Sequence, residues 1–295
     1  MTILRAAQIY SACILFFLLA IPHAHGVTLE EIRTRGTLRH LAVPYARFAN
    51  RNGEGLDCAL LKRFADYLQV SYELIPTDFH KGFLDLTGTD IDDPTHPQSP
   101  SKIIGDIFAS GVTVLPERYQ YVDFSLPTFS SQVWLMAKTD SELTPIRPSG
   151  DAARDIALTL RQLSQQTIFG VSGTSLDIKN FPILTSVDVT LHNLIYTKKT
   201  STFQFALQRQ ILFLAESPNI LVGLNQWPFR FKVIGPISPP MDMAVAFDKN
   251  SSELREAFNQ FFKDLWESGE YKKMVEHYYP GAFFYLASFL KKSTP

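Results

Sequence analysis

The stretch GLDCALLKRFADYLQVSYELIP, residues Gly55 to Pro76, decides the fold class. Its first part carries apolar residues at helical spacing, and SYELIP at its end has the composition of a strand. A second predicted strand, Thr37 to Val43, precedes it, and Gly36 separates that strand from an earlier helical turn. Strand, helix and strand at this spacing are typical of a parallel βαβ unit, so the sequence predicts an α/β fold.

The rest of the chain extends this pattern into a second half. Strands are predicted around 106–113 and over 131–138, with a surface loop rich in proline and aspartate over 85–101. A polar segment, TDSELTPIRPSGDAARD, then precedes another α/β pattern, which begins with the strand TIFGV and a Gly-Thr-Ser turn. The segment SSELREAFNQFFKDLWESG predicts an amphipathic helix near the C-terminus. Two lobes are therefore predicted, without an internal repeat.

Composition excludes several classes of function. The 295 residues include 28 basic and 29 acidic ones, and no block of Lys or Arg interrupts the chain, so nucleic-acid binding is not expected. The sequence has no His-Glu-x-x-His, no Cys-x-x-Cys and no phosphate loop, so we expect no metal and no cofactor. Ser172 is followed directly by Gly173, which does not match the Gly-x-Ser-x-Gly pattern of a serine hydrolase.

The N-terminus has the pattern of a secretory signal peptide, which we place at residues 1–26. Arg5 precedes an apolar run from Ile9 to Ile21, too short for the roughly 20 residues that span a bilayer. We therefore expect cleavage near Gly26 and a soluble mature protein. Of the two cysteines only Cys58 would remain, in an apolar helix, so we expect a structural cysteine and no internal disulfide.

Several residues suit the binding of a small zwitterion. The guanidinium of Arg118 can hold a carboxylate with two parallel N–H donors, and the Thr113 hydroxyl and Gly111 backbone can add hydrogen bonds. The turn containing Thr174 follows a strand and precedes a predicted helix, where free backbone N–H groups favour a polar or anionic group. Glu216 can face an ammonium. Each feature also has a plainer interpretation, because Arg118 could form a surface ion pair and the turn could be only a helix cap.

The segment SGVTVLPERYQYVDFSLPTFSSQVWLMA resembles the signature of family 3 periplasmic solute-binding proteins, which bind amino acids and similar polar solutes between two α/β lobes. The resemblance continues in GTLRHLAV, FGVSGTS and GEYKKMVEHYYPG. Within the family, GLDCALLKRFADYL and the tyrosine-rich end are most similar to the substrate-binding module of membrane-bound lytic transglycosylase F. The residues after Gly281 are too few for the peptidoglycan-cleaving domain of that family, so we expect no such activity.

The resemblance implies the α/β two-lobe periplasmic binding protein fold of type II, with a hinge and a ligand cleft between the lobes. Residues 27–136 and 237–282 would form the first lobe, 137–236 the second lobe, and 283–295 a C-terminal tail. The chain would cross between the lobes near Met136 to Thr139 and again near Gly235 to Pro239. The location implied is the periplasm.

Matching positions imply five ligand-binding residues: Gly111, Thr113, Arg118, Thr174 and Glu216. A sixth, Tyr45, is expected in VPYARFA, which stands in place of the family's aromatic-proline loop. Arg118 would hold the carboxylate of the ligand, with Gly111 and Thr113 beside it in the first lobe. Thr174 would be the anion contact of the second lobe, Glu216 would receive an amino group, and Tyr45 would form an aromatic wall.

The function expected is capture of an amino acid or similar small polar zwitterion for transport, by a monomer without catalytic residues that an ABC permease would read in its closed form. Two alternatives remain open. One is a muropeptide- or peptide-sensing module related to lytic transglycosylase F, and the other is a dehydratase-like enzyme on the same scaffold, with Glu216 as general acid.

Overall fold

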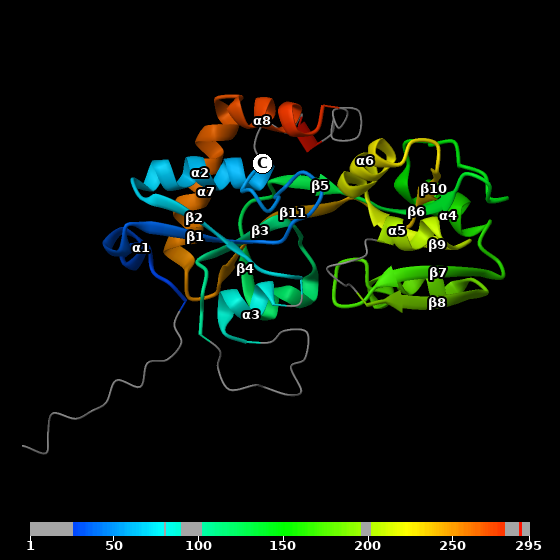
Figure 1. Ribbon diagram of the computed structural model, residues 1–295, viewed down its shortest axis with the longest axis horizontal. Helices are drawn as coiled ribbons and strands as arrows, with labels where there is room; N and C mark the ends of the chain where they lie inside the picture. Colours follow the sequence, from blue (N-terminus) through cyan, green and yellow to red (C-terminus); the bar gives the residue numbers. More distant parts are fainter. Residues whose placement is uncertain (1–25, 80, 90–101, 196–201, 281–288, 291–295) are drawn as a thin grey trace, which may run out of the picture.

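Two α/β lobes make up the computed structural model, which describes residues 26–79, 81–89, 102–195, 202–280 and 289–290 (Figure 1). The first lobe contains a six-stranded sheet and the second a five-stranded sheet. Residues 1–25 of the predicted signal peptide, the predicted tail apart from 289–290, and residues 90–101 of the predicted loop lie outside the described residues. The start of that predicted loop is helical, because α3 (Gly82–Thr87) extends to Thr87. Among those residues, no helix has the length and apolar character needed to cross a bilayer.

The sheet of the first lobe has the strand order β2-β1-β3-β11-β4, and β5 also pairs with β11. β1 is parallel to β2 and β3, whereas β3, β4 and β5 are antiparallel to β11. The parallel βαβ unit predicted from the opening stretch is therefore confirmed. The strand bounds are β1 (Thr37–Ala42), β2 (Ser71–Pro76), β3 (Ile107–Thr113), β4 (Val122–Phe124), β5 (Phe129–Ser131) and β11 (Met241–Asp248).

Helices α2 and α7 build the main core of the first lobe. Most of the predicted apolar stripe of α2 is buried, although Tyr67 is half exposed. Phe64 packs edge-on against Phe258 of α7 with ring centroids 5.2 Å apart. Burial also raises the pKa of the Cys58 thiol to about 11, as expected for a structural cysteine. The helices of this lobe are α1 (Leu29–Arg35), α2 (Leu56–Leu68), α3 (Gly82–Thr87), the 3₁₀ helix η1 (Pro116–Gln120), α7 (Ser252–Glu267) and α8 (Glu270–Tyr278).

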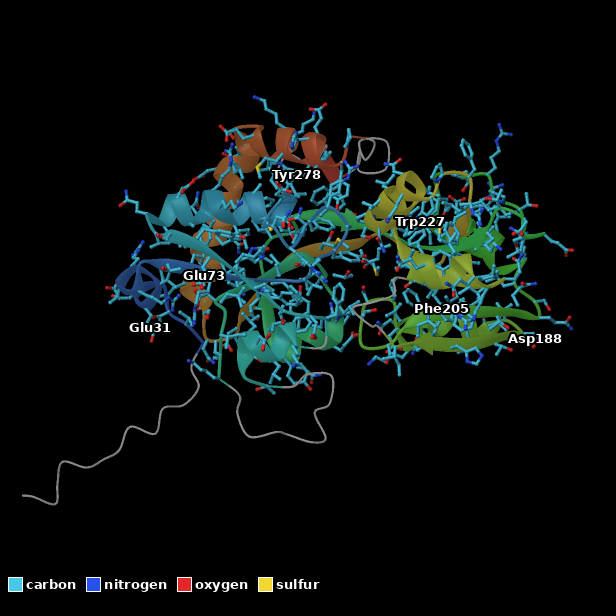
Figure 2. All side chains as sticks on the ribbon, in the orientation of Figure 1. Glu31, Glu73, Asp188, Phe205, Trp227 and Tyr278 are labelled. Atoms are coloured by element: carbon cyan, nitrogen blue, oxygen red, sulfur yellow. The ribbon has the colours of Figure 1, made fainter. Side chains whose placement is uncertain are left out.

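The sheet of the second lobe has the order β10-β6-β9-β7-β8. Its core includes Phe203, which stacks on Trp227 and meets Phe213 edge-on, and Figure 2 shows Trp227 and Phe205 in this lobe. The elements are β6 (Val133–Lys138), α4 (Ala152–Leu160), β7 (Gln166–Val171), η2 (Ile178–Asn180), η3 (Pro182–Ser186), β8 (Val189–Leu194), α5 (Thr202–Leu207), β9 (Leu212–Glu216), α6 (Ser217–Gln226) and β10 (Phe231–Pro236).

The first crossing between the sheets is earlier than the sequence predicted. β5 ends at Ser131 in the first sheet and β6 begins at Val133 in the second, so the chain crosses at Gln132 and not near 136–139. The run 131–138 is continuously β-prone, and composition cannot tell which sheet each half joins. The second crossing lies between β10 and β11, after Pro236. We therefore place the lobe boundary at 132 in place of 136.

A buried carboxylate fixes the start of β3 against β1. Asp106 is 1% exposed and accepts hydrogen bonds from the Arg39 guanidinium at 2.7 and 3.1 Å and from the Arg39 backbone N–H at 2.8 Å. The guanidinium of Arg35, at the end of α1, donates to its other oxygen as well. One charge therefore ties together α1, β1 and the residue before β3.

A second buried carboxylate, Asp57, lies in the first turn of α2. One of its oxygens accepts the backbone N–H of Gly111 in β3 at 2.7 Å, and the other is buried without a hydrogen-bond partner. Burial raises the pKa of Asp57 to about 7, and the hydrogen bond from Gly111 opposes that shift. Asp57 thus joins α2 to the strand that leads into the space between the lobes.

Replacing Asp106 with Ala should lower the free energy of unfolding by about 3–5 kcal/mol, because two guanidinium groups lose a buried partner. Glu270→Ala is the matched control, since the Arg63–Glu270 pair is about half exposed on both sides and should contribute less than about 1 kcal/mol. Urea denaturation of both variants measures the difference. Equal losses in the two variants would contradict the role of Asp106.

Asp57 should make stability depend on pH in a specific direction. Its folded pKa lies above the unfolded value of 3.8, so its contribution to the unfolding free energy rises as the pH falls through 7. The unfolding free energy of the wild type minus that of Asp57→Asn should grow by about 3 kcal/mol between about pH 8 and pH 5.

The prediction is stated as a difference between the two proteins because His40 also makes stability depend on pH. Burial lowers the pKa of His40 to about 4, so its contribution to the unfolding free energy falls as the pH falls. His40 is present in both proteins, so its contribution cancels in the difference. Denaturant titrations over this pH range test the prediction, and a difference that stays constant with pH would refute it.

Candidate functional site

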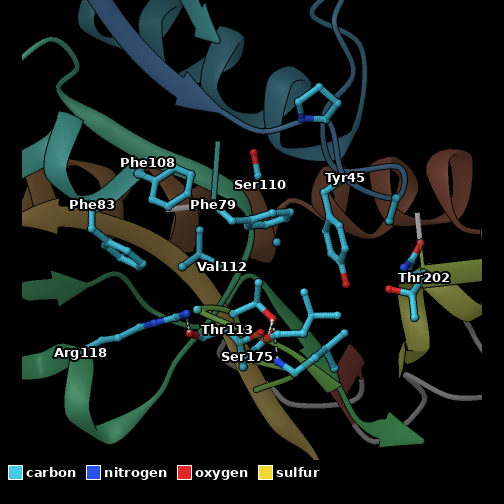
Figure 3. A pocket seen from close by; sticks show the side chains of 18 residues that line it. Tyr45, Phe79, Phe83, Phe108, Ser110, Val112, Thr113, Arg118, Ser175 and Thr202 are labelled. Atoms are coloured by element: carbon cyan, nitrogen blue, oxygen red, sulfur yellow. Dashed lines mark hydrogen bonds between the residues drawn. The ribbon is translucent and has the colours of Figure 1, made fainter. Parts of the chain in front are cut away.

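A pocket of about 170 Å³ lies between the two lobes (Figure 3). Its lining includes residues that follow or end strands β1 and β3 of the first lobe and β7 of the second, together with residues of α3, α5 and α6. The carboxyl ends of these strands therefore meet at one place, which is where ligands bind in open α/β sheets. Five of the six residues proposed from the sequence line this pocket: Tyr45, Gly111, Thr113, Arg118 and Thr174.

The sixth residue, Glu216, lies behind that lining. It is the last residue of β9, is 2% exposed, and is not among the described residues that form the pocket wall. Its Oε1 accepts the hydroxyl of Thr113 at 2.6 Å and that of Ser175 at 3.0 Å, and its Oε2 accepts the hydroxyl of Tyr45. Tyr45 and Thr113 belong to the first lobe and Ser175 to the second. The carboxylate of Glu216 therefore joins the lobes.

Tyr45 reaches Glu216 from the loop between β1 and α2. Its backbone N–H donates to the carbonyl of Ala49 at 3.0 Å, which closes a tight loop. Its ring meets that of Phe79 edge-on, with centroids 5.5 Å apart. These contacts hold the ring in the pocket wall and direct the hydroxyl toward the second lobe (Figure 3).

Arg118 lies in η1, just beyond the end of β3, and is half-buried. Its Nη1 donates to the backbone carbonyl of Thr113 at 2.7 Å, and its guanidinium lies 4.9 Å from the centre of the Phe83 ring. The aromatic face and the carbonyl fix the plane of the guanidinium. The side chain thereby brings positive charge to the pocket wall (Figure 3).

Gly111 lines the pocket, but its N–H has another partner. We expected this backbone group to bind the ligand, yet it donates to Asp57, as described above. The residue has φ +63°, and a Cβ there would lie 2.4 Å from the Phe48 ring. Gly111 is therefore needed for close packing and chain direction. The prediction that its N–H binds a ligand is wrong, because that N–H already donates to Asp57.

The turn that contains Thr174 does not begin a helix, contrary to the sequence prediction. The Thr174 hydroxyl donates to the carbonyl of Val171 and accepts the N–H of Leu176, and the N–H of Gly173 donates to Asp177. Only the short η2 follows, and Pro182 lies close behind it. The N–H groups of Gly173 and Leu176 are thus used within the turn, and the helix N-terminus proposed as an anion site is absent from this described segment.

Sequence reasoning missed the aromatic side of the pocket. Phe79, Phe83 and Phe108 line it beside Tyr45 (Figure 3), and Ser175 supplies the second-lobe hydroxyl on Glu216. Phe79 and Phe83 are four residues apart, but only Phe83 lies in a helix, α3, and Phe79 precedes it. Nothing in the sequence distinguished aromatic residues that line a pocket from those that lie in the core.

The family described as bacterial extracellular solute-binding proteins, family 3, matches residues 103–281, more than half of the chain. A curated relative from Desulfosudis oleivorans, named membrane-bound lytic murein transglycosylase F, is 25% identical over 227 residues. That match covers 76% of this chain and 44% of the relative, so the chain spans less than half the length of that protein.

Solved structures agree in fold. A mutant of ArgBP from T. maritima has a TM-score of 0.67 and 22% identity, and the match covers 86% of this chain and all of that one. An ancestral amino acid-binding protein, described as a precursor of cyclohexadienyl dehydratase, has a TM-score of 0.62 and 23% identity, with coverage of 85% and 98%. The predicted two-lobe, type II α/β fold is confirmed. The chain belongs to the bacterial extracellular solute-binding proteins of family 3.

Proposed function

We propose that this chain captures a small solute that carries a carboxylate, such as an amino acid or a similar polar molecule, and delivers it for transport. One observation carries the proposal: the pocket is lined from both lobes, and Arg118 is part of its wall. A planar guanidinium matches the geometry of a carboxylate, and the carbonyl of Thr113 holds this one in place by accepting from its Nη1.

Capture would proceed by closure of the lobes over the solute. A ligand that touches both lobes favours the closed state, because only that state completes both sets of contacts. The two crossings, at Gln132 and after Pro236, are the positions where the lobes would turn. Membership of an extracellular solute-binding family supports a periplasmic location and a permease as the partner that reads the closed form.

Binding without chemistry fits the site better than catalysis. A general acid must come within hydrogen-bond reach of the atom that it protonates. Glu216, the candidate acid, is separated from the pocket by three hydroxyl-bearing side chains of the wall. We therefore propose a binding protein and not a dehydratase-like enzyme.

A cell-wall sensing module is the second candidate, and the curated transglycosylase relative favours it. The pocket volume of about 170 Å³ argues against it, because a cavity of about 150 Å³ accommodates a molecule of the size of benzene, and a muropeptide is several times larger. A thermal-shift screen of carboxylic acids, amino acids, short peptides and muropeptides separates the two. A ligand at 100 times its dissociation constant adds about 2.7 kcal/mol of stability.

Arg118→Ala should weaken binding of the best carboxylate from that screen by about 2–5 kcal/mol, because the buried carboxylate would lose its charged partner. Arg118→Lys should restore only part of the affinity, since an ammonium cannot donate two parallel hydrogen bonds to the carboxylate. Titration calorimetry measures both variants.

Arg51→Ala serves as the control, because Arg51 is an exposed cation of the same lobe outside the described pocket lining. It should bind like the wild type. Circular dichroism must first establish that each variant is folded. A folded Arg118→Ala protein with unchanged affinity would reduce Arg118 to a surface residue and end the proposal.

A further inference from the structure

The carboxylate of Glu216 is supplied with hydrogen bonds by the protein itself. Three hydroxyl groups donate to it, two on Oε1 and one on Oε2, from Thr113, Ser175 and Tyr45. A carboxylate oxygen has two lone-pair positions, so Oε1 is fully used. A buried carboxylate needs such donors, and here the donors are side chains and not a ligand.

The same three side chains also separate Glu216 from the pocket. Each of them lines the cavity, whereas Glu216 does not appear among the described lining residues. Oε2 keeps one acceptor position, but Glu216 is 2% exposed behind these side chains, so a ligand ammonium could reach it only if one of them moved aside. The geometry therefore leaves Glu216 as a contact between lobes.

The rest of the described lining offers neutral hydroxyl and amide oxygens but no anionic partner for a cation. It contains no aspartate or glutamate, and much of it is apolar, including Phe79, Phe108, Val112 and Leu176. An ammonium transferred into such a wall loses its hydration without gaining an anionic partner.

An aromatic face can also bind a cation, but the guanidinium of Arg118 already lies over the ring of Phe83. Arg118 would repel a second positive charge placed there. The ring faces of the pocket are therefore better suited to an apolar ligand body than to a cationic one.

We propose that the site takes a compact monocarboxylic acid with an apolar or aromatic body and no α-ammonium group. The inference rests on the proposed function for the contact between Arg118 and the carboxylate, and it adds the selection against the amino group. The acid enters as an anion, its body lies against the phenylalanine rings, and Glu216 remains bonded to the three hydroxyls.

Matched pairs of ligands test the selection directly. We would titrate the wild type with 3-phenylpropanoate against phenylalanine, and with 4-methylpentanoate against leucine, by calorimetry at neutral pH. In each pair the acid without the amino group should bind at least about 10-fold more tightly. The amide 3-phenylpropanamide is the control that keeps the body and removes the anion, and it should not bind.

If an amino acid binds as tightly as the acid of the same pair, or more tightly, the inference is overturned. The proposal that Arg118 binds the ligand carboxylate would then still stand. Absence of binding by all four compounds would overturn it too. The Arg118 variants, measured with the best ligand of the wider screen, then decide whether the proposed function fails as well.

Ser175→Ala provides a test within the site. It removes one donor from Oε1 of Glu216 and opens a path from the pocket to the carboxylate. The preference for the acid over the amino acid should fall by about 10-fold, because an ammonium can now take the vacated position.

A purely structural role for Ser175 would weaken both ligands of a pair alike and leave their ratio unchanged, which would contradict the inference. Ser186→Ala is the matched control, since it removes an exposed hydroxyl of the same lobe that lies outside the described pocket lining and donates to the carbonyl of Ile183. Its ratio of affinities should equal that of the wild type.

Discussion

The arrangement of the two lobes depends on one buried carboxylate. A carboxyl group that is 2% exposed must be hydrogen-bonded, and Glu216 obtains two of its three donors from the opposite lobe. A hydrogen bond to such a group contributes on the order of 1 kcal/mol net, because water would satisfy the same group if the lobes separated. The contacts of Tyr45 and Thr113 with Glu216 thus stabilise this arrangement of the two lobes. The crossing at Gln132 lies beside this contact, since the carbonyl of Gln132 accepts the N–H of Ser217 at 3.0 Å.

Much of the fold could be predicted because it depends on local patterns. The helix over Leu56–Leu68 and the strands beside it follow from periodicity, and the family signature supplied the two-lobe arrangement. The crossing at Gln132 could not be predicted in the same way. β5 and β6 are separated by one residue without a glycine or proline, so no turn signal marks the change of sheet. Which sheet a strand joins is decided by pairing with distant strands.

The sequence predicted several of the residues that form the pocket, but it did not predict the hydrogen-bond partners of those residues. The sequence singled out Arg118, Thr113, Tyr45 and Glu216, and the structure brings them together. It could not reveal that the N–H of Gly111 is taken by Asp57, because the two residues are 54 positions apart and meet only in the fold. The prediction of an anion site in the turn after β7 was wrong for the opposite reason. The N–H donors of that turn are satisfied within it, by the side chains of Thr174 and Asp177. Hydrogen-bond partners, and not residue types, decide which groups remain for a ligand.

The selectivity of such a site can change while the fold stays the same. The structures that this chain resembles share its two sheets at 22–23% identity, which leaves the chemistry of the pocket to a few polar atoms. A carboxylate behind the pocket wall can accept hydrogen bonds either from the amino group of a ligand or from hydroxyl groups of the protein. In this chain the hydroxyls of Tyr45, Thr113 and Ser175 take that place. Two of these bonds join the lobes, and all three occupy the carboxylate that a zwitterion would need as its anionic partner, so the arrangement of the lobes and the proposed selectivity depend on one group.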